Sequence, residues 1–239
     1  MQMIDRPVVA LVVAAGSGSR LGGEVPKALV QIDGRPLVRW SVEAMVAGGC
    51  QRVVVVVAAP LVDDFRAALA GVSVPLQIVV GGARRQDSVA NGLAAAGEQG
   101  IVLVHDAARP FVPVDVVRSV HEAVAQGAAC VIPVVPVIDS IRRARGVSSH
   151  VVDRSELVAV QTPQGFDLAT LRESHEQAAL QGLEVTDDAA VCEAAGHPVL
   201  LVAGAREAMK VTEPFDIHVA NAIATQRRQM AANAFQENP

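Results

Sequence analysis

Short apolar runs, separated by stretches long enough for helices, constrain the fold of this chain more than any other sequence feature. The clearest run is Val53–Val57, five consecutive valines that follow the turn-like pair Gly48-Gly49. Strands buried on both faces show such unbroken runs, because neither face meets water. Similar runs occur at Val8–Ala14, Leu76–Val80, Ile101–Val104, Cys130–Val135 and Val199–Val202. Their alternation with helical stretches predicts an α/β fold with a doubly wound, mostly parallel sheet.

The stretches between the apolar runs carry helical patterns. In the segment Pro113–Ala125, the residues Val117, Val120 and Val124 fall on one face of a helix. A proline also suits the first turn of a helix, which places the start of this one at Pro113. The other predicted helices span Leu37–Ala47, Leu61–Leu69, Asp87–Ala96, Asp167–Leu180, Asp187–Ala195 and Pro214 to about Met230.

One segment, residues 136–160, interrupts this alternation. It is rich in Val, Ser and Arg and lacks a helical stripe, although a crossover helix is expected at this point of the chain. We interpret it as an extended β-arm outside the sheet. Such an arm usually docks on a partner, and a second copy of the chain is the simplest one, so a homodimer is predicted. Residues 1–230 are expected to form a single domain, followed by a disordered tail at 231–239.

Charge and composition argue against several classes of protein. The chain has 20 Lys and Arg against 25 Asp and Glu and no basic run, which disfavours nucleic-acid binding. The apolar runs are too short to span a bilayer, and residues 1–7 lack the apolar core of a signal peptide. Cys50, Cys130 and Cys192 show no C-x-x-C spacing, so neither a zinc site nor a disulfide framework is indicated. We therefore expect a cytoplasmic protein without a nucleic-acid or membrane partner.

A glycine-rich segment at the end of the first predicted strand is the strongest local signal. Residues 14–21 read AAGSGSRL, and Lys27 follows shortly after. Glycine-rich turns let backbone N–H groups approach a phosphate closely, and Arg20 and Lys27 add positive charge. Dinucleotide-binding loops require glycine where Leu21 stands, and the P-loop motif is absent. The segment predicts polyphosphate binding, with a tight strand-to-helix connection carrying two solvated charges as the alternative.

Asp106 and Arg109 follow another predicted strand in the sequence VHDAARP at 104–110. Ligands of open α/β sheets bind beyond the carboxyl ends of the strands, which is where these two side chains are expected. Asp106 is a candidate for contact with ribose or metal, because Mg²⁺ commonly takes one or two carboxylates together with substrate phosphates. The alternative is that Asp106 caps the turn or pairs with Arg109.

The sequence GGARRQDS at 81–88 links a predicted strand to a helix. Asp87 or Ser88 is the predicted N-cap of that helix. Exposed backbone in this loop is suited to reading the edge of a base, although a capped helix start with nothing bound fits these residues equally well. Lys210 lies between Met209 and Val211, an apolar setting that suggests a cation directed at a ligand.

Taken together and in order, these segments resemble the 2-C-methyl-D-erythritol 4-phosphate cytidylyltransferase family over about Val8 to Ala220. The motifs that carry the resemblance are AAGSGSRL with PK at 26–27, GGxxRxDSV at 81–89, VHDAARP at 104–110, DS at 139–140, DRxxL at 153–157, QTPQ at 161–164, TDD at 186–188 and KVT at 210–212.

The resemblance implies a Rossmann-like nucleotidyltransferase fold whose β-arm is used for dimerisation. It also implies transfer of a cytidylyl group from CTP to 2-C-methyl-D-erythritol 4-phosphate, a step of the non-mevalonate route to isoprenoid precursors. The products would be 4-diphosphocytidyl-2-C-methyl-D-erythritol and pyrophosphate. Mg²⁺, or another divalent ion such as Mn²⁺, is the implied cofactor, with Asp106 as its candidate ligand.

Site residues follow from the same resemblance. Arg20 and Lys27 would stabilise the charge that develops at the α-phosphate. Lys210 and Arg154 would position the sugar-alcohol phosphate, with Arg154 reaching over from the arm of a neighbouring subunit. The remaining implied substrate-binding residues are Ala14, Ala15, Gly16, Gly82, Ala83 and Ser88 for cytidine, Asp106, Arg109, Ser140 and Thr162 for the acceptor, and Ala107 and Thr186.

Three rival functions stay open at this point. One is cytidylyl transfer to another polyol phosphate such as ribitol 5-phosphate. A second is a dinucleotide-dependent oxidoreductase, which Leu21 disfavours because it breaks the glycine fingerprint. The third is a nucleotide-binding protein without catalytic activity.

Overall fold

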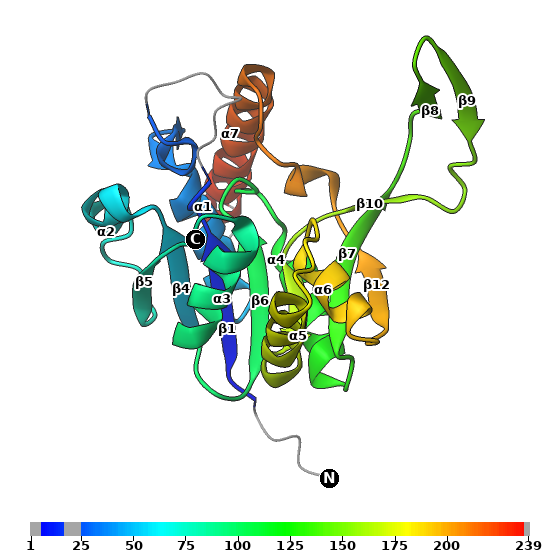
Figure 1. Ribbon diagram of the computed structural model, residues 1–239. Helices are drawn as coiled ribbons and strands as arrows, with labels where there is room; N and C mark the ends of the chain where they lie inside the picture. Colours follow the sequence, from blue (N-terminus) through cyan, green and yellow to red (C-terminus); the bar gives the residue numbers. More distant parts are fainter. Residues whose placement is uncertain (1–5, 17–24, 237–239) are drawn as a thin grey trace.

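A mixed sheet forms the centre of the computed structural model, which describes residues 6–16 and 25–236. Its eight strands run in the order β10-β7-β11-β6-β1-β4-β5, with β12 paired to β7. Six of the strands are mutually parallel: β1 (Val8–Val13), β4 (Arg52–Val57), β5 (Leu76–Val80), β6 (Ile101–Asp106), β7 (Cys130–Pro136) and β12 (Val199–Ala203). The predicted α/β fold with a mostly parallel sheet is confirmed (Figure 1).

Two antiparallel strands, β10 (Val158–Val160) and β11 (Gln164–Asp167), were not expected from the sequence. β11 lies between β6 and β7 and pairs with both, so that Gly165 is opposite Leu103 on one side and Val131 on the other. β6 and β7, which follow each other as apolar runs, are therefore not neighbours in the sheet. Glycine is required at 165 because a Cβ there would lie 2.4 Å from Val120 Cγ1 on the overlying helix.

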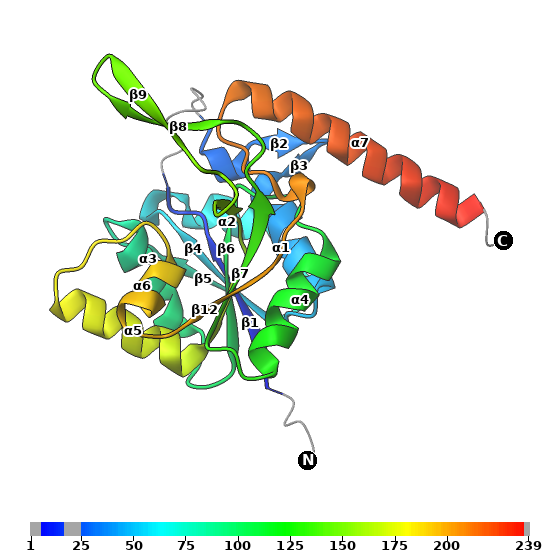
Figure 2. The ribbon, with the colours of Figure 1, turned by 90° about the vertical axis from the view of Figure 1, so that its right-hand side faces the viewer.

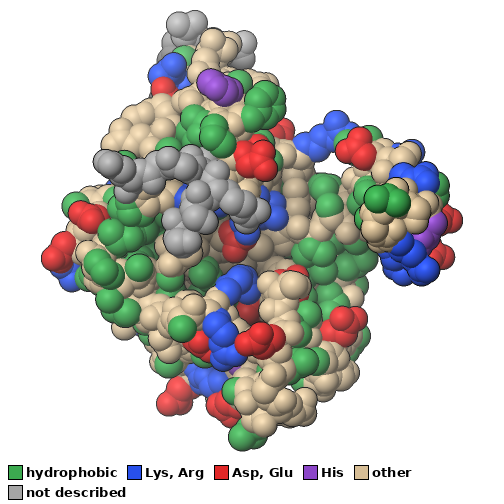
Figure 3. All heavy atoms as spheres, turned by 45° about the horizontal axis from the view of Figure 1, so that its top comes forward, with side chains coloured by type: hydrophobic (Ala, Val, Ile, Leu, Met, Phe, Trp, Pro, Cys, Tyr) green, Lys and Arg blue, Asp and Glu red, His purple; other side chains and the backbone are tan. Residues whose placement is uncertain are grey.

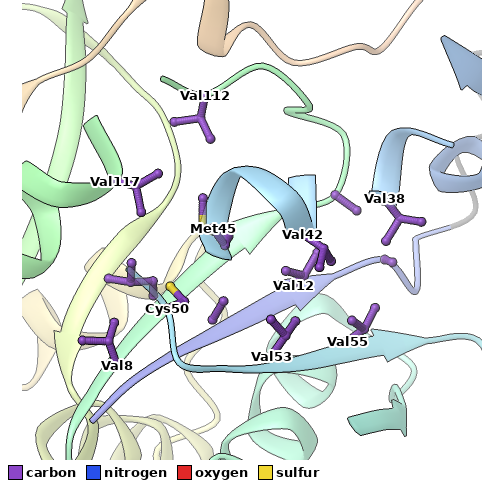
Figure 4. Close-up of a cluster of buried hydrophobic side chains, with 14 of the residues drawn as sticks. Val8, Val12, Val38, Val42, Met45, Cys50, Val53, Val55, Val112 and Val117 are labelled. Atoms are coloured by element: carbon purple, nitrogen blue, oxygen red, sulfur yellow. The ribbon is translucent and has the colours of Figure 1, made fainter. Parts of the chain in front are cut away.

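Helices cover both faces of the sheet. One face carries α1 (Leu37–Ala47), α2 (Val62–Ala68) and α4 (Val114–Ala125), and the other carries α3 (Arg85–Ala95), α5 (Leu168–Leu180) and α6 (Asp188–Ala194) (Figure 2). An apolar cluster lies on each face of the sheet, and alternate valines of β4 point to the two clusters. Val53 and Val55 pack with Val42 of α1 in the cluster on the first face (Figure 4), and Val54 and Val56 belong to the cluster on the other face. The doubly wound arrangement explains why that strand is valine throughout.

A third apolar cluster attaches the C-terminal helix α7 (Pro214–Gln236) to the body. Its buried members are Ile32, Leu37, Phe111, Val211, Ala220 and Ala224. β2 (Gln31–Ile32) and β3 (Arg35–Pro36) form a small antiparallel ribbon at this cluster, and short 3₁₀ helices occur at Lys27–Leu29, Ala59–Leu61 and Arg206–Ala208. No helix in residues 6–16 or 25–236 combines the length and apolar character needed to cross a membrane.

The predicted helices all occur, and six of the seven have bounds within two residues of the prediction. The exception is the last one: α7 continues to Gln236, so its predicted end at about Met230 is wrong. The tail predicted at 231–239 is helical as far as Gln236, and residues 237–239 lie outside the described part of the chain. α7 extends well beyond the body (Figure 2).

The segment 136–160 does leave the body as an arm (Figure 1). β8 (Ile141–Arg145) and β9 (Ser148–Val152) pair as an antiparallel hairpin that turns at Gly146, whose φ of 59° suits glycine. Residues 142–151 are all exposed. The arm is shorter than predicted at its C-terminal side, because Val158–Val160 return to the sheet as β10 and pair with β7.

Candidate active site

A cavity of about 340 Å³ opens beyond the carboxyl ends of β1 and β6. Figure 3 looks onto this end of the molecule, where several Lys and Arg side chains gather. The described lining residues are Val13, Ala14, Gly16, Lys27, Ala28, Ala83, Arg84, Arg85, Ser88, Asp106, Ala107, Ala108, Lys210 and Thr212. The cavity lies where open α/β sheets bind their ligands.

Both lysines of the chain line this cavity, although they are separated by most of the sequence. Lys27 comes from the 3₁₀ helix after the glycine-rich segment, and Lys210 from the loop before α7. The structure thus brings together the predicted cations at 27 and 210 with Asp106. Arg20, the other cation of the glycine-rich segment, lies outside the described residues.

Asp106 is the only acidic side chain among the described residues that line the cavity. Its Oδ2 accepts a hydrogen bond from Lys210 Nζ at 2.7 Å, and its Oδ1 lies 3.9 Å from the guanidinium of Arg85. Burial alone would raise the pKa of Asp106, but the positive charges of Lys210 and Arg85 outweigh it and hold the pKa below its usual value. Asp106 is therefore ionised at neutral pH. The alternative in which it pairs with Arg109 is replaced by this pairing with Lys210.

Arg85 is a residue of this site that the sequence reading missed. Its guanidinium lies 2.7 Å from Asp188 Oδ2, at the start of α6, while the side chain also lines the cavity. Asp188 in turn accepts a hydrogen bond from His175 Nε2 at 3.0 Å. The GGxxRxDSV motif contains this arginine, but the sequence does not show that its side chain pairs with Asp188 on α6.

The loop at 81–88 is compact and held by its own side chains. Ser88 is buried, and its Oγ accepts from the Gly82 N–H at 3.1 Å and donates to the Arg84 carbonyl at 3.0 Å. The predicted N-cap is wrong: α3 begins at Arg85 with Arg84 as its N-cap, and Asp87 accepts from the Arg84 N–H at 3.1 Å. A Cβ on Gly82 would lie 2.4 Å from Asp87 Cβ, so this glycine is required for the turn.

Thr162 supports Asp106 from behind rather than lining the cavity. Its Oγ1 accepts from the Asp106 N–H at 3.1 Å and lies 3.0 Å from Nδ1 of the buried His105. His105 Nε2 is 3.1 Å from the Arg109 carbonyl, which can only accept, so Nε2 carries the proton and Thr162 donates to Nδ1. Burial lowers the pKa of His105 to about 4, which keeps the ring neutral.

Two glutamines beside Thr162 extend this support. Gln161 donates to the Ala205 carbonyl at 2.8 Å and accepts from the Ala205 N–H at 3.1 Å, which ties the loop that leads to Lys210. Gln164 donates to Asp187 at 2.8 Å and accepts from the Ala189 N–H at 3.2 Å, at the start of α6. Residues 161–164, which lead into β11, therefore contact three parts of the site: the backbone of Asp106, the loop before Lys210 and the start of α6.

Comparison with known proteins agrees with this geometry. The family model described as IspD, 2-C-methyl-D-erythritol 4-phosphate cytidylyltransferase, matches residues 8–226. The chain belongs to this cytidylyltransferase family. It is therefore a nucleotidyltransferase, which sets aside the dinucleotide-dependent oxidoreductase.

Alignments with individual members of the cytidylyltransferase family cover nearly the whole chain. The 2-C-methyl-D-erythritol 4-phosphate cytidylyltransferase of Corynebacterium diphtheriae is 43% identical over 233 residues, covering 93% of this chain and 96% of the relative. The crystal structure of that enzyme from Thermus thermophilus matches with a TM-score of 0.78 at 40% identity, over 92% of this chain and 99% of that one. The 4-diphosphocytidyl-2C-methyl-D-erythritol synthase of Anaerococcus prevotii has a TM-score of 0.82 at 25% identity, over 94% and 99%.

Not every residue predicted for this cytidylyltransferase site reaches the cavity of the single chain. The Arg109 guanidinium donates to the carbonyls of Ala208 at 2.8 Å and Val160 at 3.4 Å. Arg154 donates to the Ile138 carbonyl at the base of the arm. Ser140 and Thr186 are exposed, and neither they nor Ala15 and Gly82 are among the described residues that line the cavity. Ala14, Gly16, Ala83, Ser88 and Ala107 do line it.

Proposed function

We propose that this cavity is where the chain transfers the cytidylyl group of CTP to 2-C-methyl-D-erythritol 4-phosphate. The observation that carries the proposal is the convergence of Lys27, Lys210 and Asp106 from three distant segments. The product is 4-diphosphocytidyl-2-C-methyl-D-erythritol, and pyrophosphate leaves. Such chemistry needs positive charge and close placement of two phosphates, and the cavity offers both.

The nucleotide lies along the β1 side of the cavity in this proposal. The described lining contains no aromatic residue, so the base is held by backbone groups and small side chains near Ala14, Gly16, Ala83 and Ser88. Lys27 contacts the triphosphate together with Arg20 of the glycine-rich segment. A cation near the α-phosphate stabilises the negative charge that grows there as the new bond forms.

The acceptor lies on the Asp106 side, between Lys210 and Arg85. An oxygen of its phosphate attacks the α-phosphorus in line, and the bond from that phosphorus to the bridging oxygen of the β-phosphate breaks. The attacking phosphate is already anionic, so no general base is required. Lys210 places the acceptor, and Thr162 fixes the backbone of Asp106 through the hydrogen bond at 3.1 Å.

Mg²⁺ fits the donor set of this cavity. In the described part of the chain no group of three or more His, Cys, Asp or Glu side chains could hold a metal alone, which leaves Asp106 and the substrate phosphates as ligands. One carboxylate with phosphate oxygens is a common arrangement for Mg²⁺. When bound, the ion supplies charge neutralisation to the triphosphate, and Asp106 is kept ionised for that role by its lowered pKa.

The thiols suit a reduced cytoplasm, where we place the protein. Cys50, Cys130 and Cys192 are free and buried. Burial raises the pKa of Cys50 to about 12, which keeps this thiol protonated and unreactive.

Two copies of the chain would complete the site through the arm. The arm projects from the body, so its hairpin is available to a second subunit (Figure 1). A second cavity, of about 700 Å³, lies at the base of the arm and is lined by Ile138, Leu157, Val158 and Leu201 as well as Arg154. Exposed apolar side chains around a cation favour a protein partner over open solvent. In the dimer, Arg154 of one subunit reaches the acceptor bound to the other.

Mixing two inactive variants tests this exchange. Arg154→Ala and Lys210→Ala, each a dimer with both sites damaged, should regain about a quarter of wild-type activity after their subunits are exchanged, because about half of all dimers are then heterodimers and each heterodimer has one intact site of two. The measurement is pyrophosphate release before and after exchange, with sedimentation to confirm the dimer. Activity that stays at the level of the separate variants would mean that Arg154 serves its own subunit.

Nucleotide and acceptor choice test the function itself. With 2-C-methyl-D-erythritol 4-phosphate and Mg²⁺, pyrophosphate release should occur with CTP and be at background with UTP, ATP and GTP, because a base read by hydrogen bonds rejects edges that cannot form them. Faster turnover of ribitol 5-phosphate than of the methylerythritol substrate would favour that rival acceptor. Silence with every pair would indicate a binding protein without catalytic activity.

A further inference from the structure

Arg85 lies between two carboxylates that belong to different parts of the fold. Its guanidinium is 2.7 Å from Asp188 and 3.9 Å from Asp106, and 33% of the side chain is exposed. Asp106 already has Lys210 at 2.7 Å. Two cations and two carboxylates thus form one chain of contacts at the edge of the cavity, and Arg85 is the member that links its buried end to its open end.

Asp188 lies at the buried end of this series of ion pairs. Its side chain is 1% exposed, and it accepts from Nε2 of His175, which is also buried and comes from α5, at 3.0 Å. The first turn of α6, which carries Asp188, is fastened to β11 because Gln164 accepts from the Ala189 N–H. Removing a carboxylate from water is costly unless it is paired, and Asp188 has both His175 and Arg85 as partners.

The ion pair with Asp188 also keeps the Arg85 guanidinium from pairing closely with Asp106. Without it, the nearest anion for the guanidinium is Asp106, which would then be shared between Arg85 and Lys210. A planar guanidinium can bind one anion along one edge and keep further N–H donors for another. Held by Asp188, Arg85 keeps such donors for a ligand phosphate in the cavity that it lines.

We infer that Asp188, supported by His175, is a positioning residue that holds the Arg85 guanidinium toward the phosphate of the acceptor. The inference rests on the proposed cytidylyl transfer and assigns Arg85 to the acceptor phosphate beside Lys210. Asp188 does not touch the substrate; it acts through Arg85 and keeps that cation apart from Asp106.

A double-mutant cycle tests this role. Arg85→Ala should lower kcat/KM for the acceptor about 10- to 100-fold, as expected for a lost charged hydrogen bond. Asp188→Asn, which keeps the size of the side chain, should lower it about tenfold, since the guanidinium is then drawn toward Asp106. The double variant should be no worse than Arg85→Ala to within about twofold, because Asp188 has no effect without its arginine. KM for CTP should stay within about twofold throughout, since the changes act on the acceptor side.

Asp167→Asn is the matched control. Asp167 is also a carboxylate that pairs with an arginine, Arg6, and caps a helix through the Thr170 N–H, but it lies at the opposite end of the sheet. Its replacement should leave both KM values unchanged. If Asp188→Asn does not fold, His175→Gln takes its place, with a smaller loss that should again vanish in the Arg85→Ala background.

Additive losses in the double variant, or a change confined to thermal stability, would overturn the positioning role. A rise in KM for CTP instead of the acceptor would overturn the assignment of Arg85 to the acceptor phosphate. The wild-type enzyme, measured in the same assay, distinguishes failure of the proposed function from failure of this inference. No pyrophosphate release by the wild type would refute both. An active wild type whose variants show additive losses would refute the inference alone.

Discussion

Replacing Lys27 with alanine should lower kcat about a hundredfold at saturating CTP. Lys27 lines the cavity at the end of β1, directly after the glycine-rich segment, and is one of the chain's two lysines. Removing a group that stabilises developing charge at the reacting phosphate costs about 3 kcal/mol of transition-state stabilisation. Steady-state pyrophosphate release with CTP and 2-C-methyl-D-erythritol 4-phosphate measures the effect.

The matched control is Arg118→Ala, which also removes one positive charge but from the exposed side of α4. Its kcat should equal that of the wild type. A loss of less than about threefold for Lys27→Ala would contradict a transition-state role. A rise in KM for CTP at unchanged kcat would instead show that Lys27 binds the ground state and the transition state equally.

Replacing Phe166 with alanine should lower the free energy of unfolding by about 3–5 kcal/mol. Phe166 is fully buried in β11 and packs in the cluster beneath α5 and α6. Its strand is paired on both sides, so the cavity left behind cannot close by movement of an edge. Denaturant unfolding followed by circular dichroism gives the difference.

Phe215 offers the comparison, because it is the same residue type at 72% exposure. Phe215→Ala should change the free energy of unfolding by no more than about 0.5 kcal/mol. A loss below about 1 kcal/mol for Phe166→Ala would mean that β11 contributes little to the stability of the sheet, against the packing described here.

The strands that the sequence predicts are those buried on both faces by helices. β4 is read without difficulty because each of its valines from 53 to 57 meets a helix on one face or the other. β11 carries no such signal: Gln164 is polar, Gly165 is small, and only Phe166 is a large apolar residue. Its burial depends on a side-chain bond to Asp187 and on the close approach of α4, which are contacts between distant residues.

The residues of the candidate site also fall into two groups, those that the sequence predicts and those that it does not. Loops that follow strands are visible in the sequence, because glycine and charge cluster there, and Lys27 and Asp106 were found by that signal. Lys210 was found by its apolar neighbours instead. The direction of a polar side chain is not visible. Thr162 turns to the backbone of Asp106, 56 residues away, and Arg85 is held by a carboxylate on α6. The direction of each of these side chains depends on which distant residue the fold brings within hydrogen-bonding distance.

The position of β11 sets an order for building the sheet. β6 and β7 are connected through α4 and leave a gap one strand wide, which a segment beyond the arm must fill. A nascent chain that ends before residue 164 therefore presents two unpaired strand edges in its interior. The half of the sheet made of β1, β4 and β6 can assemble early from nearer segments, whereas closure waits until the chain has passed through the arm and returned. During synthesis, the arm is thus a stretch that the ribosome must complete before the protein has a continuous sheet.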